Sequence, residues 1–132
     1  MVKSVMRKLI PSAVCLEILM LATLGFAQDA VKLSPQYYNV LLDNEHVRVL
    51  EYRLKPGEKE PMHSHPAGIV YVFGQAKLKI TYPDGRTEVN TLTPAETYWR
   101  EPVTHMAENV GNTEAHAIAL ELKKPCNSNQ TL

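Results

Sequence analysis

The stretch GEKEPMHSHPAGIVYVFG, residues 57–74, combines a histidine pair with a run of apolar residues. His63 and His65 are two positions apart, so on a β-strand both rings point to the same face. Residues 69–73 form a continuous apolar run, which favours a strand buried on both faces. The charged residues 58–60, before the pair, are interpreted as an exposed turn.

Short β-rich runs separated by turn residues continue on both sides of this stretch. Residues 77–82 alternate polar and apolar side chains, and a second run at 87–92 follows the sequence Pro-Asp-Gly-Arg at 83–86. That sequence is typical of a turn, because proline presets φ and glycine accepts a positive φ. Further strands are expected at 47–54, 97–100, 103–110 and 115–122. About eight strands at this spacing indicate an all-β sandwich or barrel.

The composition limits the classes of protein to which the chain can belong. It has 132 residues, with 14 basic and 14 acidic side chains. This length fits a single domain, and the charge balance argues against a nucleic-acid partner. Two cysteines are too few for a disulfide framework.

Residues 1–27 have the pattern of an export signal: a positively charged start, a mostly apolar stretch and small residues at the end. We expect cleavage between Ala27 and Gln28, a single domain at 28–124 and a polar tail at 125–132. The mature protein is then periplasmic or secreted and makes no membrane contact. The alternative is that the segment remains as an anchor.

His105 is the candidate for a third metal ligand. It lies on the strand expected at 103–110, on the same face as Ala107, which suits an inward direction. Neutral imidazole is the commonest metal ligand in proteins. We therefore predict that His63, His65 and His105 hold one divalent cation.

The order of these residues resembles the two motifs of small single-domain cupins. In the first motif a glycine stands before a His-x-His pair, and a second glycine closes the next strand; here these are Gly57, His63, His65 and Gly74. In the second motif a proline, a histidine and an asparagine follow in order; here these are Pro102, His105 and Asn109. The resemblance implies a double-stranded β-helix, a small antiparallel jelly-roll barrel with the metal inside its mouth.

The glutamate ligand usual in the first cupin motif is missing, since residues 68–70 are Gly-Ile-Val. Glu101 and Glu108 are the alternatives for the lost carboxylate. Three neutral histidines leave a divalent ion at its full charge, which favours a small anionic or chelating ligand. Fe²⁺ and Zn²⁺ are the leading candidates for the ion, with copper, nickel and manganese as further ones.

Five more residues are expected to line the ligand pocket. Val70 and Val72 share the strand parity of the missing glutamate, and Arg100 could hold a carboxylate at the barrel mouth. Asn109 and His116 complete the set. Their alternatives are hydrogen bonds that stabilise a buried turn, for Asn109, and a satisfied half-buried position, for His116.

Two functions of different classes follow from the resemblance. The first is a metal-dependent enzyme, dioxygenase-like or a lyase or isomerase, that acts on a small anionic or chelating metabolite. The second is a non-catalytic module that binds or senses a small ligand, because fold does not imply function. In both cases the partner is a small molecule, and a homodimer through the barrel faces is expected.

Overall fold

The computed structural model of the protein describes residues 28–123. The predicted export signal at 1–27 and the predicted polar tail at 125–132 lie outside the described residues. Within them the chain forms one short helix and nine strands. These are α1 (Ala30–Leu33), β1 (Tyr38–Asp43), β2 (Val47–Leu54), β3 (His63–His65), β4 (Gly68–Gly74), β5 (Ala76–Thr81), β6 (Thr87–Leu92), β7 (Thr97–Arg100), β8 (Val103–Asn109) and β9 (Ala115–Leu122). No helix among residues 28–123 is long and apolar enough to cross a membrane.

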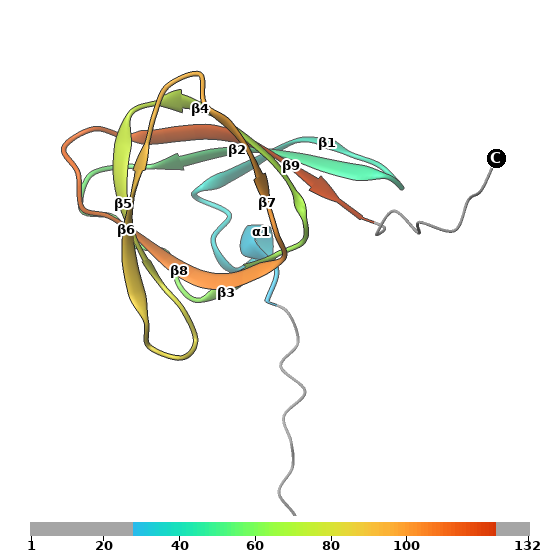
Figure 1. Ribbon diagram of the computed structural model, residues 1–132. Helices are drawn as coiled ribbons and strands as arrows, with labels where there is room; N and C mark the ends of the chain where they lie inside the picture. Colours follow the sequence, from blue (N-terminus) through green and yellow to red (C-terminus); the bar gives the residue numbers. More distant parts are fainter. Residues whose placement is uncertain (1–27, 124–132) are drawn as a thin grey trace, which may run out of the picture.

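The strands form two sheets around a common interior (Figure 1). One sheet has the order β1-β2-β9-β4-β7 and the other the order β3-β8-β5-β6. Strands from the end of the chain lie between strands from its beginning, with β9 between β2 and β4 and β8 between β3 and β5. Every strand pairing is antiparallel. The predicted all-β barrel is confirmed, and β1 is a strand that the sequence did not predict.

β4 shows which face of the five-stranded sheet is covered. Val70 and Val72 face the interior and are buried. Ile69, Tyr71 and Phe73 face outward, and each is between 39% and 48% exposed. The prediction that this strand is buried on both faces is therefore wrong. An antiparallel sheet needs only one covered face, and here large apolar side chains stand on the solvent side.

β9, like β4, carries its smaller apolar side chains on the inner face and its larger ones on the outer face. Its buried positions are Ala115, Ala117 and Ala119, while the larger apolar residues between them are half-buried. Small side chains on the inner face leave room for those that project from the opposite sheet. The same parity continues to Glu121, which is buried. A carboxylate is thereby placed inside the barrel.

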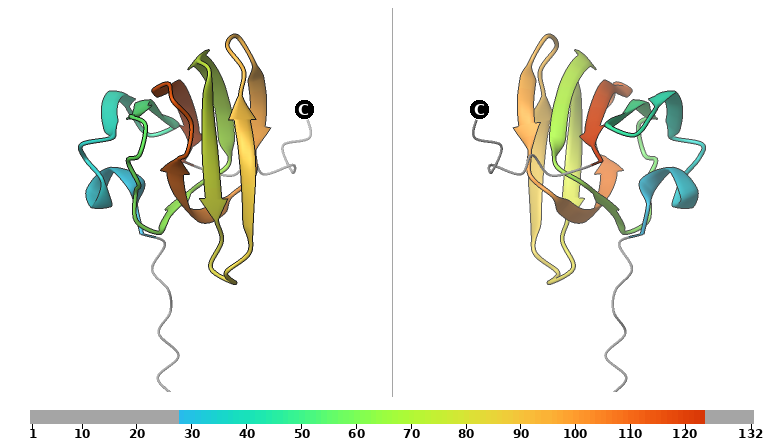
Figure 2. Two further views of the ribbon diagram at one scale, coloured as in Figure 1. Left: turned by 90° about the vertical axis from the view of Figure 1, so that its left-hand side faces the viewer. Right: turned by 90° about the vertical axis from the view of Figure 1, so that its right-hand side faces the viewer.

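The hairpin between β5 and β6 has the turn predicted from the sequence. Gly85 has a φ of +83°, which glycine adopts without strain. The amide of Tyr82 donates to the carbonyl oxygen of Arg86 at 2.9 Å and closes the turn. This hairpin extends beyond the other strands (Figure 2).

The residues before β1 pack against the strand that carries the histidine pair. The amide of Ser64 donates to the carbonyl oxygen of Gln28 at 2.8 Å. Asp29 caps α1 by accepting from the amide of Lys32 at 3.1 Å, and it pairs with Arg48 at 2.7 Å. Because of these contacts, β3 is bonded on one edge by β8 and on the other by the residues around Gln28.

Candidate metal centre

Three histidines converge inside the barrel. His63 and His65 are the buried ends of the short strand β3. His105 lies directly opposite His63 in the antiparallel register of β3 and β8. One nitrogen of each ring lies within 4.8 Å of those of the other two. The group could therefore hold a metal ion, with the residues predicted from the sequence.

Hydrogen bonds determine which nitrogen of His63 and His65 carries hydrogen. His63 Nδ1 lies 2.8 Å from the carbonyl oxygen of Pro61, and His65 Nδ1 lies 2.6 Å from Glu121 Oε1. A carbonyl and an ionised carboxylate can only accept, so both Nδ1 atoms donate. In a neutral ring Nε2 then has a lone pair and no hydrogen.

Burial keeps these rings neutral. It lowers the pKa of His65 to about 4 and that of His105 to about 3, and it also lowers the pKa of His63. The nearby positive charge of Arg100 acts in the same direction on all three. Neutral imidazole is the form that binds metal, so the site is in its binding state near neutral pH.

His63 Nε2 and His65 Nε2 lie 2.9 Å apart, which is hydrogen-bond distance. Neither atom has a hydrogen to place between them, so two lone pairs face each other. A cation beside both nitrogens turns this repulsion into attraction. The donor set thus fits a divalent transition metal, for which imidazole is a suitable ligand.

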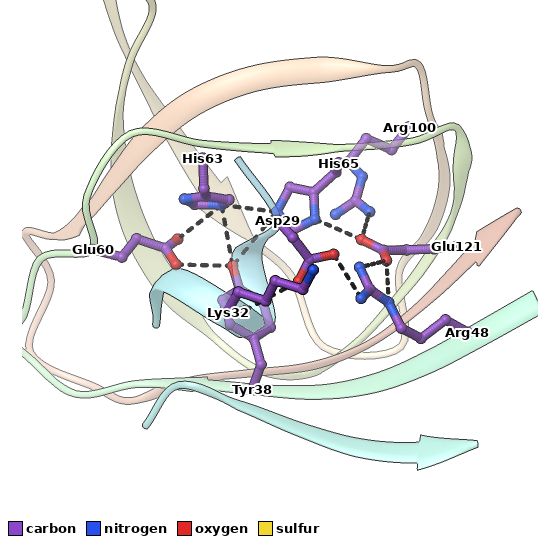
Figure 3. A network of polar contacts seen from close by, with 9 residues as sticks. All are labelled: Asp29, Lys32, Tyr38, Arg48, Glu60, His63, His65, Arg100 and Glu121. Carbon is purple, nitrogen blue, oxygen red and sulfur yellow. Dashed lines mark hydrogen bonds and ion pairs between the residues drawn. The ribbon is translucent and has the colours of Figure 1, made fainter. Parts of the chain in front are cut away.

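Glu121 holds His65 from the side opposite the convergence point (Figure 3). Its Oε1 accepts from His65 and, at 3.2 Å, from Arg100, while its Oε2 accepts from Arg48 at 2.7 Å. Burial would raise the pKa of Glu121, but the hydrogen bonds from His65 and Arg48 outweigh it and lower the pKa. A carboxylate at this place sets the tautomer and direction of a metal-binding histidine.

Glu60 is a second buried carboxyl beside the histidines, and it overturns the prediction of an exposed turn. It is 1% exposed. Its Oε2 accepts from the Tyr38 hydroxyl at 2.8 Å and its Oε1 from the Tyr52 hydroxyl at 3.2 Å. Burial raises the pKa of Glu60 to about 7 against the effect of these bonds. The amide of Glu60 donates to the carbonyl oxygen of Ala107 on β8 at 2.9 Å, which holds this segment against the barrel.

A cavity of about 640 Å³ lies next to the histidines. Val70 and Arg100, two of the residues expected to line it, are in its wall with His65 and His105. Much of the remaining wall is apolar or aromatic, including Leu78, Ile80, Leu92, Tyr98, Trp99 and Ala107. A small molecule with an apolar body has room beside the metal ligands.

The other three residues expected in the pocket lie elsewhere. Val72 belongs to the packed core and does not reach the cavity. Asn109 is buried and donates to two backbone carbonyl oxygens, each at 2.8 Å, so it stabilises a turn. His116 stands on the outer face of β9, half-buried, 2.9 Å from Glu51. Its parity is opposite to that of the inward alanines, which excludes it from the interior.

Neither alternative carboxylate reaches the histidines. Glu101 is exposed and accepts from the indole of Trp99 at 2.7 Å. Glu108 points away from the interior, 4.0 Å from Lys79. The three-histidine group found within residues 28–123 therefore has no acidic member.

Comparison with solved structures decides the family. A cupin domain from Bordetella pertussis Tohama I is 31% identical to this chain, with a TM-score of 0.61. The match covers 66% of this chain and 92% of that one. The chain is a cupin.

More distant structures have the same fold as this cupin. An RmlC-like cupin family protein with a double-stranded β-helix fold, from Methanocaldococcus jannaschii, matches at 15% identity and a TM-score of 0.52, over 64% of this chain and 77% of that one. The polyketide cyclase RemF from Streptomyces resistomycificus matches at 19% identity and a TM-score of 0.50, over 66% and 64%. No established family profile and no curated protein matches the sequence.

Gly68 begins the stretch 68–70, in which the glutamate usual in the first cupin motif is missing. It pairs with Arg100 of β7 on one side and with Glu121 of β9 on the other. The ion pair between Arg100 and Glu121 therefore spans the glycine. The carboxylate of Glu121 reaches His65 from the neighbouring strand, but at Nδ1, away from the point where the rings converge.

Three residues near the histidines were not predicted from the sequence as part of the site. For Glu121 the sequence holds a usable signal, since this residue continues the inward parity of Ala115, Ala117 and Ala119. For Glu60 it holds no such signal, because this residue lies in a charged run. Tyr38 is in a strand that was not predicted.

Proposed function

We propose that this cupin binds one divalent transition-metal ion through His63, His65 and His105. The observation that carries the proposal is the 2.9 Å between His63 Nε2 and His65 Nε2, with both Nδ1 atoms donating elsewhere. A bound cation satisfies both lone pairs. Fe²⁺ and Zn²⁺ suit such a site best, with copper, nickel and manganese as further candidates.

The ligand we propose is a small anionic or chelating molecule. Arg100 lines the cavity beside His65 and His105. Its Nε is buried and has no hydrogen-bond partner in the described part of the chain. An unpaired guanidinium N–H is a strong donor to a carboxylate or enolate oxygen. When bound, the metal would supply a Lewis acid or a binding place for O₂.

Glu60 favours an enzyme, dioxygenase-like or a lyase or isomerase, over a non-catalytic binding or sensing module. Its carboxyl lines the cavity, and its Oε1 lies 3.8 Å from His63 Nε2. With a pKa of about 7 it can accept and return a proton near neutral pH. The hydroxyls of Tyr38 and Tyr52 hold it in place.

Metal analysis of protein purified without a histidine tag tests the binding site. We expect about one equivalent of metal in the wild type and its loss in His105→Ala, because two imidazoles hold an ion weakly. His116→Ala, on the outer face, is the matched control and should retain the metal. Unchanged metal content in His105→Ala would overturn the ligand set.

Turnover separates the two classes of function. O₂ uptake that depends on an added thiol or diketone, and is absent in His105→Ala, would support the dioxygenase-like enzyme. A small molecule that copurifies with the protein and is released unchanged, with no turnover, would support the binding module.

A further inference from the structure

The oxygen of a tyrosine lies beside the facing nitrogens of two of the three histidines, His63 and His65. The hydroxyl oxygen of Tyr38 is 3.2 Å from His63 Nε2 and 3.5 Å from His65 Nε2 (Figure 3). Tyr38 is buried at the start of β1, in the other sheet from the histidines. Its ring meets both imidazoles edge-on, with centroids 6.0 and 5.8 Å apart. The phenol therefore faces the site across the barrel.

The hydrogen of the Tyr38 phenol points away from the histidines. The bond to Glu60 Oε2, at 2.8 Å, is the shortest of the three contacts of this hydroxyl. When Glu60 is ionised, its Oε2 accepts the one hydrogen of the phenol, so the phenol oxygen turns lone pairs toward both Nε2 atoms. Three atoms with lone pairs and no hydrogen among them thus lie within 3.5 Å of one another.

We propose that Tyr38 is a fourth protein donor to the metal, in the role of the glutamate that the first cupin motif lacks. The inference rests on the proposed three-histidine site and adds an oxygen to it. Ligand atoms about 2.1 Å from one ion lie about 3.4 Å apart in a tetrahedron, close to the two Tyr38 distances. When the oxygen binds, its proton passes to Glu60 Oε2, which already accepts the hydrogen bond. Glu60 is then a positioning residue.

Tyr52 is a matched control from the same cluster. Its ring centroid lies 5.2 Å from that of Tyr38, and its hydroxyl donates to the other oxygen of Glu60 at 3.2 Å. The two tyrosines are 8% and 7% exposed. Within residues 28–123 the Tyr52 hydroxyl has no hydrogen bond to a histidine. Tyr52→Phe therefore disturbs Glu60 and the packing but leaves the proposed donor in place.

Copper spectroscopy tests the inference on the whole protein. A tyrosine oxygen bound to Cu²⁺ gives a visible charge-transfer band, and Raman excitation within that band enhances the ring vibrations of the tyrosine. Imidazole ligands alone give neither signal. After chelator treatment and addition of Cu²⁺, we expect both signals in the wild type and in Tyr52→Phe, and neither in Tyr38→Phe. Zinc affinity should fall about 10–100-fold in Tyr38→Phe and stay near wild type in Tyr52→Phe.

The outcomes separate this inference from the proposed function. Wild-type protein that binds copper without the band or the ring vibrations would overturn Tyr38 as a donor and leave the three-histidine site standing. Wild-type protein that binds neither copper nor zinc would overturn both. Because both overturning results are read on the wild type, they do not depend on how a variant folds.

Discussion

His65 shows how the surroundings of one residue prepare it for a metal. Glu121 accepts from its Nδ1, and two arginines hold that glutamate. The same burial that shapes the site lowers the pKa of the ring to about 4. The residue therefore presents an Nε2 lone pair over most of the pH range in which proteins work.

The neutral histidines make the stability of the metal-free protein sensitive to acid. His65 and His105 titrate near 6.5 in the unfolded chain, against about 4 and about 3 in the folded one. Above pH 6.5 both states hold neutral rings. Between about 6.5 and the folded values, the unfolded state binds more protons, so these two groups reduce the free energy of unfolding as the pH falls.

Thermal unfolding from pH 8 to pH 4, compared between histidine variants, measures how much these two histidines contribute to the acid sensitivity of the protein. Glu60 acts in the opposite sense, because a raised pKa makes the folded state bind more protons between about 4.5 and 7. The comparison is therefore between variants: His105→Gln should lose less stability toward acid than the wild type. His46→Gln, at an exposed histidine, should match the wild type. Equal acid sensitivity of His105→Gln and the wild type would contradict the prediction.

Among the elements, the close approach of β4 and β9 decides where Glu121 stands. Gly68 pairs with Glu121 across these strands. A Cβ added at Gly68 would overlap the backbone carbonyl oxygen of Leu120. Backbone cannot move aside as a flexible side chain does, so the approach requires glycine.

Gly68→Ala should therefore destabilise the fold and loosen the site together. We expect a loss of about 3 kcal/mol in the free energy of unfolding, measured with urea, from overpacking against the backbone. Metal affinity should also fall, because the strand that carries Glu121 is displaced. Gly85→Ala is the control: its φ is +83° but its surroundings are open, so the loss should be about 1 kcal/mol with unchanged affinity. A loss at Gly68 no larger than that at Gly85 would refute the argument.

In the whole molecule, the proposed site joins the two sheets. His63, His65 and His105 belong to the four-stranded sheet, whereas Tyr38 and Glu121 belong to the five-stranded one. A ligand held only by the folded barrel stabilises it by mass action. The metal should therefore act on the unfolding of the complete domain and not on one loop.

Zinc at about 100 times its dissociation constant should raise the melting temperature by about 10 °C or more, and a chelator should reverse the rise. His116→Ala should show the same increase. His105→Ala should show none, and a full increase in that variant would place the metal elsewhere. The homodimer and the export signal expected from the sequence stay predictions.

The sequence by itself determined most of the strands, though not β1, and also the β5–β6 turn and the three candidate ligands. These depend on local properties: side chains alternate along a strand, glycine accepts a positive φ, and two histidines two positions apart share a face. Only the tertiary structure decided that the apolar run of β4 is covered on one face alone. It placed Glu60, from a charged run, at 1% exposure, and it brought Tyr38 and Glu121 to the histidines from the other sheet. Burial and contact between distant strands depend on how the sheets pack, and no local pattern encodes that packing.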